Sequence, residues 1–162
     1  DGVSFGFRMT EPTPDKLWIS EPAGSWHNDN VELFFDVTGK GAGDYYQIIL
    51  DARNEGLCTI HAAEKDGWKP MNLKSQIYKG KDFWSAEIFI PFSEFATLKD
   101  AQIPKTSSGG LFWLGNFTRH RKADGYSKNK AEGSIPEMQR LNTRYSWWSA
   151  DQSAFGTLKF VE

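Results

Sequence analysis

Trp26-His-Asn-Asp-Asn-Val-Glu-Leu-Phe-Phe-Asp36 and Tyr45-Tyr-Gln-Ile-Ile-Leu-Asp51 are the two stretches that decide the fold. The first contains most of a predicted strand, Val31 to Val37, because it is rich in apolar and aromatic residues. The second predicts another strand at hairpin distance, since the glycine-rich run 38–43 between them has the composition of a turn. We therefore expect these two strands to pair.

Other segments extend this pattern in both directions. Six further predicted strands cover residues 3–9, 57–62, 74–78, 83–90, 111–120 and 156–161. One short helix is expected from Pro91 to Leu98, because apolar residues recur there every three positions and proline suits a first helical turn. The polar residues 121–143 predict one long loop. Short strands separated by turns predict an all-β antiparallel sandwich, immunoglobulin-like or jelly-roll in type, with one short helix.

Composition limits the domain count and the possible partners. A chain of 162 residues has the size of one domain, which we expect to span 1–162. Its 19 basic and 21 acidic residues leave a net charge of -2, which argues against nucleic-acid binding. No apolar run approaches the roughly 18 residues of a membrane helix. Aromatic residues make up 15% of the chain and include 7 Trp, which favours carbohydrate binding because sugar rings pack against aromatic faces.

Several motifs resemble family 9 carbohydrate-binding modules, sandwich domains often attached to xylanases. Trp26 to Asp36 resembles the W-x-x-D-x-V-E-I-F-I-D segment of that family. Further matches follow in the same order at Tyr46-Gln47, Trp84 to Phe92, Gly115 to Arg119, Ser146-Trp147 and Phe155 to Leu158. The resemblance runs from about Val3 to the end of the chain. The additional N-terminal strands of such modules have no counterpart in this sequence.

This resemblance implies a non-catalytic module that binds a monosaccharide, an oligosaccharide or a polysaccharide such as xylan or cellulose. We expect the module to belong to a larger, secreted polysaccharide-degrading protein, extracellular or periplasmic, with a catalytic domain in the same parent chain. Related modules bind structural calcium, so calcium is an expected cofactor. No EF-hand pattern assigns its ligands.

The resemblance also implies where the sugar binds. In the family two tryptophans enclose a terminal sugar. Trp26 matches the first of them, and Trp147 or Trp148 corresponds to the second. Glu32 matches a carboxylate that hydrogen-bonds sugar hydroxyls, and Asn116 is expected to add a directional hydrogen bond.

An arginine is also expected at the sugar. Ile49 stands where the xylanase modules place a sugar-binding arginine, so we expect an arginine elsewhere in the chain to supply that donor. Arg119, Arg121 and Arg144 are the candidates. We favour Arg119, because it follows Asn116 on the strand next to the expected slot.

The residues themselves leave some of these roles open. Period two puts Glu32 on one strand face with Phe34, so it is either a sugar ligand or the partner of a nearby arginine. Trp26 is either a binding residue or part of the core, and of the adjacent Trp147 and Trp148 one should face the core. Trp84 and Trp113 lie in apolar strands and are expected in the core.

Three other functions need consideration. An accessory domain could keep the fold without binding sugar. A haem-binding relative could use Met9, Met71 or Met138 as axial ligands. A glycosidase needs two carboxylates about 5 to 10 Å apart, whereas residues 32 and 36 of one strand would be about 13 Å apart.

Overall fold

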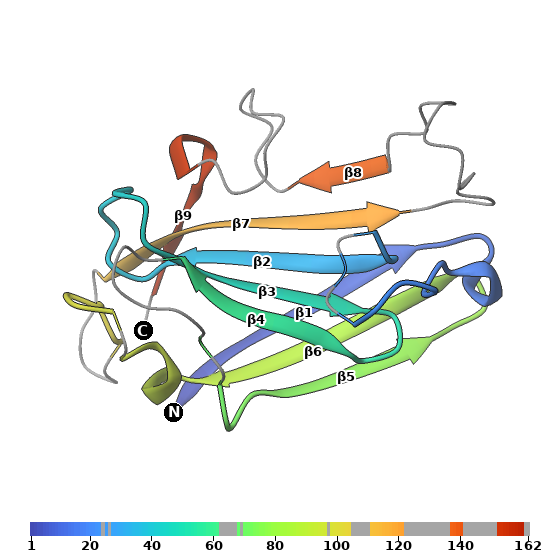
Figure 1. The fold of residues 1–162 in the computed structure, drawn as a ribbon, viewed down its shortest axis with the longest axis horizontal. Coiled ribbons are helices and arrows are strands. Elements are labelled where there is room, and N and C mark those ends of the chain that lie inside the picture. The colour runs from blue at the N-terminus through green and yellow to red at the C-terminus, as the bar shows by residue number, and fades with distance from the viewer. Residues whose placement is uncertain are drawn as a thin grey trace.

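The computed structural model of the chain describes residues 1–23, 25, 27–61, 68, 70–96, 98–104, 111–121, 137–140 and 152–160. For residues 57–61, 137–140 and 154 it describes the backbone alone. Within these ranges the chain forms nine strands, which lie in two sheets packed as layers (Figure 1). The fold is the all-β antiparallel sandwich that the sequence predicts.

The smaller layer is a three-stranded antiparallel sheet with the strand order β1-β6-β5. Its strands are β1 (Gly2–Thr10), β5 (Lys74–Lys79) and β6 (Phe83–Pro91). Alternate residues of the central strand β6 are buried, namely Trp84, Ala86, Ile88 and Ile90. The smaller sheet therefore turns one apolar face toward the interior.

The larger layer is a six-stranded antiparallel sheet. Its strands are β2 (Asn30–Asp36), β3 (Tyr45–Asp51), β4 (Gly56–His61), β7 (Phe112–Arg121), β8 (Glu137–Arg140) and β9 (Gly156–Lys159). The strand order is β4-β3-β2-β7-β8, and β9 pairs with the first part of β7 while β8 pairs with its last part. Strand β2 therefore lies between β3 and β7, away from the edges of the sheet.

The core fills the space between the two sheets. Phe35 of β2 lies near its centre, with ring centroids 5.0 Å from Phe5 of β1 and 6.1 Å from Trp113 of β7. Trp84 and Trp113 are both fully buried, which confirms their predicted place in the core. Aromatic rings from both sheets thus hold the layers together, and their burial is the main favourable contribution to folding.

The helical segments within the described ranges are single 3-10 turns: η1 (Pro14–Lys16), η2 (Phe92–Phe95) and η4 (Gln152–Ala154). The short helix predicted from Pro91 to Leu98 is thus reduced to η2. The Tyr46 hydroxyl and the Trp68 indole N–H donate to the last two carbonyls of this turn, at 2.8 and 2.9 Å. Because side chains of the core take these acceptors, the turn ends without becoming an α-helix.

The sequence places eight strands correctly and misses one. The stretch 121–143 was predicted to be a single loop, but Glu137–Arg140 forms β8 against β7. Its Glu-Met-Gln-Arg sequence shows no apolar alternation, so only the neighbouring strand reveals it. Residues 122–136 and 141–143 lie outside the described part of the chain.

Candidate functional site

The side chains of β2 that point away from the core lie on the outer face of the larger sheet. Glu32 and Phe34 are two of them, as period two predicts. In the strand register Glu32 pairs with Ile49 and Thr118, and Phe34 pairs with Gln47 and Asn116. Paired residues of antiparallel strands share a face, so the register places all six side chains on this one.

Aromatic side chains occupy one end of this outer face. The rings of Phe34, Tyr45 and Phe155 lie 6.1 to 6.2 Å from one another between centroids. Leu114 packs against them, and this cluster is separate from the main core. The outer face therefore has an apolar end of its own, next to its polar residues.

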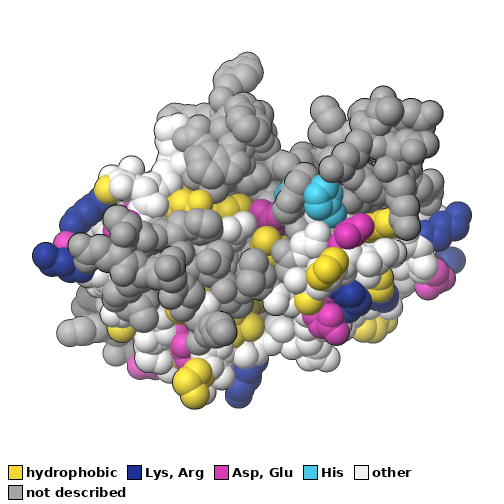
Figure 2. All heavy atoms as spheres, in the orientation of Figure 1, with side chains coloured by type: hydrophobic (Ala, Val, Ile, Leu, Met, Phe, Trp, Pro, Cys, Tyr) yellow, Lys and Arg dark blue, Asp and Glu magenta, His cyan; other side chains and the backbone are white. Residues whose placement is uncertain are grey.

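Polar side chains fill the middle of the same face. We call them the polar cluster: Glu32, Gln47, Asn116, Thr118 and His120. Glu32, Asn116, Thr118 and His120 each have 4% or less of their surface exposed. On the surface of the molecule, Figure 2 shows histidine, acidic and apolar side chains near one another around the centre of the view. A buried polar group on an outer face is unusual, because such groups are costly to remove from water.

Glu32 has the most perturbed environment of the cluster. Burial raises the pKa of its carboxyl from 4.5 to about 7, and a hydrogen bond with Gln47 opposes that shift. The Nε2 atom of His120 lies 3.5 Å from Glu32 Oε1. The carboxyl is thus held between an amide and an imidazole and changes its charge near neutral pH. A perturbed titratable group of this kind is typical of functional sites.

Asn116 and Thr118 approach Glu32 from the neighbouring strand β7. Thr118 lies directly opposite Glu32, and Asn116 lies two residues away on the same face. The Thr118 Oγ1 atom is buried and has no hydrogen-bond partner among the described residues. The same holds for Oδ1 of Asn30, which pairs with His120 in the register. Buried polar atoms normally have partners, so these two atoms are exceptions that distinguish this part of the face.

Of the residues predicted from the sequence, the structure brings Glu32 and Asn116 together and leaves Arg119 apart from them. Arg119 points to the opposite face of β7, where it donates to the Thr10 carbonyl at 2.8 Å and to Glu11 Oε2 at 2.9 Å. Arg121 also binds Glu11, at 2.7 Å. Both arginines therefore join β7 to the segment after β1 and do not extend the polar cluster.

The predicted stacking residues Trp26, Trp147 and Trp148 lie outside the described residues, as does Arg144. Their roles stay predictions. Ile49, which occupies the position matched to the family's arginine, is 5% exposed and lies opposite Glu32. The neighbour of the carboxyl on β3 is therefore apolar.

Sequence reasoning missed Gln47, Thr118 and His120 as members of the cluster. Alternation along the predicted strand 111–120 could have found Thr118 and His120, because they share the face of Asn116 in period two. Gln47 required the β2–β3 register, which depends on the length of the turn between these strands.

Metal and haem sites find no support among the described residues. Within the described ranges no group of three or more His, Cys, Asp or Glu side chains is placed to hold a metal ion. Met9 is buried in the core and Met71 is 89% exposed, so the structure does not bring these two candidate haem ligands together. The side chain of Met138 lies outside the description. No helix among the described residues has the length and apolarity to cross a membrane.

Comparison with known proteins gives relatives by structure only. No protein family model and no curated protein sequence matches the chain. A family 9 carbohydrate-binding module from Caldicellulosiruptor kristjanssonii in complex with glucose superposes with a TM-score of 0.60 and 15% identity, covering 98% of this chain and 70% of the module. Its cellotriose complex gives 0.60 and 15%, covering 98% and 68%.

A third solved structure, a Bacteroides uniformis protein proposed to bind carbohydrate, superposes with a TM-score of 0.59 and 16% identity, covering 98% of this chain and 71% of its own. All three comparisons cover nearly the whole chain. The chain has the fold of family 9 carbohydrate-binding modules.

Proposed function

We propose that the protein is a non-catalytic carbohydrate-binding module whose sugar site is the polar cluster on the outer face of the larger sheet. The observation that carries this proposal is the burial of Glu32, Asn116 and Thr118 on a face that is not part of the core. Two similar structures are complexes with glucose and with cellotriose. We therefore take glucose and short β-glucan chains as the first ligands to test.

The chemistry of the cluster fits a sugar. A carboxylate accepts hydrogen bonds from hydroxyl groups, and the amides of Asn116 and Gln47 can both donate and accept. Adjacent hydroxyls of a pyranose present the same mixture of donors and acceptors. Glu32 and Asn116 give directional contacts, and the aromatic residues at one end of the face provide an apolar boundary.

Tryptophan stacking completes the proposed site. Trp26 precedes β2 by a few residues, and Trp147 or Trp148 precedes β9. An indole against each face of a sugar ring would supply most of the buried apolar area, while the polar cluster sets orientation. We propose a secreted polysaccharide-degrading protein as the parent, with xylan and cellulose as the wider substrate class.

Isothermal titration with glucose and cellotriose tests the proposal. We expect the wild-type chain to bind at least one of them and Glu32→Gln to bind about tenfold or more weakly, as expected for loss of a charged hydrogen bond. Trp26→Ala should abolish binding. Glu87→Gln is the matched control, because Glu87 is exposed on the smaller sheet.

Two outcomes would contradict the proposal. Absence of heat with glucose, cellotriose and xylan oligomers for a folded wild-type chain would favour an accessory domain without sugar binding. Equal affinities for the wild type and Glu32→Gln would place any sugar site elsewhere on the molecule.

A further inference from the structure

The segment between η1 and β2, residues 17–29, contains Trp26, and side chains fasten it from within. The Asn28 amide nitrogen donates to the carbonyls of Glu21 and Pro22, each at 3.2 Å. The side-chain oxygen of the same residue, Asn28 Oδ1, accepts a hydrogen bond from the Glu21 N–H at 3.0 Å. The segment is thereby closed into a compact loop by one residue at its end.

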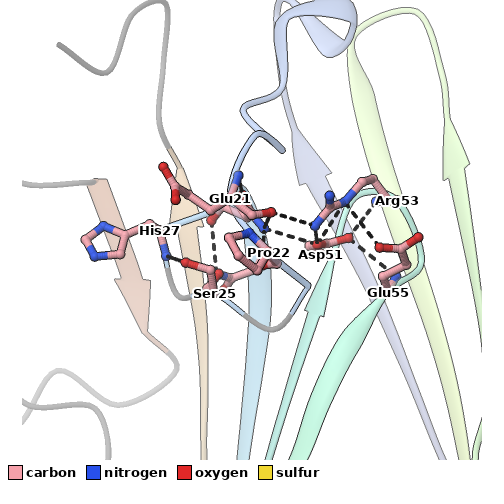
Figure 3. A network of polar contacts seen from close by, with 9 residues as sticks. Glu21, Pro22, Ser25, His27, Asp51, Arg53 and Glu55 are labelled. Atoms are coloured by element: carbon pink, nitrogen blue, oxygen red, sulfur yellow. Dashed lines mark hydrogen bonds and ion pairs between the residues drawn. The ribbon is translucent and has the colours of Figure 1, made fainter. Parts of the chain in front are cut away.

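Asp51, the last residue of β3, ties this loop to the sheet. The Asp51 side chain is fully buried, and its Oδ2 accepts from the Asn28 amide at 3.2 Å and from Arg53 Nε at 3.1 Å. Arg53 Nη2 donates both to Asp51 Oδ2 and to the Glu21 carbonyl, the latter at 3.0 Å. Figure 3 shows Arg53 and Asp51 beside Glu21 and Pro22, with the ring of His27 pointing away from them.

Three oxygens therefore converge on one small region: the carbonyls of Glu21 and Pro22 and Oδ2 of Asp51. Such a set of oxygens is what a hard cation prefers. In this chain the N–H groups of Asn28 and Arg53 occupy them instead. The calcium implied by the family resemblance does not fit at this place, because these hydrogen bonds already use its potential ligands.

The negative charge of the Asp51 carboxylate is also compensated without a metal ion. A buried carboxylate is costly unless it is paired and hydrogen-bonded. The guanidinium of Arg53 pairs with Asp51, and the hydrogen bond between them raises the pKa of Arg53 above its ordinary value. The backbone N–H of Arg53 also donates to Asp51 Oδ1 at 2.9 Å. Both carboxylate oxygens are thus satisfied by protein groups.

The described residues on either side of position 26 are hydrogen-bonded within the loop. On either side of that position, the Ser25 N–H donates to the Pro22 carbonyl at 3.0 Å and the His27 N–H donates to Ser25 Oγ at 3.2 Å. The loop then enters β2 at Asn30, two residues before Glu32. The loop is thus hydrogen-bonded at Ser25 and His27 and continues directly into the strand that carries Glu32.

We infer that Arg53 takes the place of a structural metal ion in this loop: its guanidinium ties the segment 17–29 to β3 and makes Arg53 a positioning residue for the sugar site. The part of this inference that concerns sugar rests on the proposed function. The part that concerns the loop does not.

Hydrogen exchange of residues 17–29, followed by mass spectrometry, tests the loop directly. We expect Arg53→Met to raise the exchange rate of this segment about tenfold or more, because the three hydrogen bonds of the guanidinium to Asp51 and to the Glu21 carbonyl are lost. Lys40→Met is the matched control, since it removes a cation from an exposed ion pair with Asp100 and should leave the segment unchanged. Arg53→Lys, which keeps the charge but has fewer donors, should give an intermediate rate.

The same exchange measurement is repeated with calcium and with a chelator. The inference predicts equal protection of residues 17–29 in the wild type under both conditions. A wild-type loop that loses protection on chelation would overturn it, as would an Arg53→Met loop that is protected like the wild type. If Arg53→Met does not fold, Arg53→Lys decides the question by the same comparison.

Cellotriose titration then connects the loop to the site. Arg53→Met should raise the dissociation constant about tenfold and Lys40→Met should leave it unchanged. Unchanged affinity in Arg53→Met, with a loosened loop, would refute the positioning role. Failure of the wild type itself to bind any sugar would refute the proposed function, and the exchange data would still decide whether Arg53 holds the loop.

Discussion

Glu32 is the residue on which the chemistry of the outer face depends. It is a carboxyl at 4% exposure with Gln47 as a hydrogen-bond partner and His120 within 3.5 Å. Such a group is stable only if its protonation adapts to its surroundings or a ligand supplies further hydrogen bonds. The pH at which Glu32 titrates is therefore a property of the site that can be measured without a bound sugar.

The raised pKa of Glu32 gives a pH-dependent stability. The pKa of Glu32 is about 7 in the folded chain, and its ordinary value is 4.5. Between pH 4.5 and pH 7 the folded chain therefore binds more protons at this carboxyl than the unfolded chain does. Its contribution to the free energy of unfolding therefore falls as pH rises through that window. Relative to Glu32→Gln, the wild type should lose on the order of 3 kcal/mol between pH 4 and pH 9. Urea unfolding of both chains at several pH values measures this difference, and a constant difference would contradict it.

At the level of single residues, the sequence was informative where alternation could be applied. It placed Glu32 and Phe34 on one face and Trp84 in the core. The same alternation separates Asn116 from Arg119, which lie three residues apart on one strand. The expectation that Arg119 joins Asn116 came from the resemblance and from their closeness on one strand, and the ion pair with Glu11 shows where this arginine is used.

At the level of elements, the pairing of β3 with β4 depends on a residue without a side chain. Gly56 lies opposite Leu50, and a Cβ added there would come within 2.0 Å of the Ile49 carbonyl oxygen. Gly56→Ala should therefore destabilise the chain by about 1 to 3 kcal/mol. Gly6 of β1 is the matched control, because nothing lies within 4 Å of its Cβ position.

Chemical denaturation of Gly56→Ala and Gly6→Ala compares the two positions. We expect a lower unfolding midpoint for the first variant and a midpoint close to that of the wild type for the second. Equal midpoints would show that the β3–β4 register differs from the one described.

The elements themselves were largely predictable, and the exceptions have physical causes. Strands rich in apolar and aromatic residues, such as β2 and β3, are predictable from their composition. The η2 turn was predicted as a longer helix, because the sequence does not show that Tyr46 and Trp68 bind its carbonyls. Strand β8 is polar and pairs only with β7, so its local sequence carries no strand signal.

At the level of the whole molecule, Glu11 joins the two sheets. It follows β1 of the smaller sheet and binds Arg119 and Arg121 of β7 in the larger one, while being 3% exposed. Burial by itself would raise the pKa of Glu11, but hydrogen bonds with Arg121 and Thr13 outweigh it and lower the pKa below 4.5. Its stabilising effect is thus present above pH 4.5 and is lost as pH falls through the lowered pKa.

Glu11→Gln should destabilise the chain by roughly 3 kcal/mol at pH 7, because it leaves Arg119 buried without its counter-charge. The difference from the wild type should shrink at pH 3, where the wild-type carboxyl loses its charge. Thermal or urea unfolding at the two pH values checks this, with the exposed Glu87→Gln as control. An equal difference at pH 3 and pH 7 would contradict the electrostatic role of Glu11.

The division of strands between the two sheets was the part of the fold that no local pattern could supply. β1 pairs with β6 and lies far from it in sequence, and β2 pairs with both β3 and β7. The pattern of short strands and turns predicted a sandwich, and the resemblance named a family with this fold. Only the three-dimensional pairing shows that Glu32, Asn116 and His120 share one buried face.

The most direct test of the central claim is a crystal structure of the wild-type chain with cellotriose bound. We predict a glucose ring against the outer face of the larger sheet, with a hydroxyl within hydrogen-bond distance of Glu32 and another near Asn116. Cellotriose bound only to the smaller sheet, or at a place without contact to the polar cluster, would contradict the account.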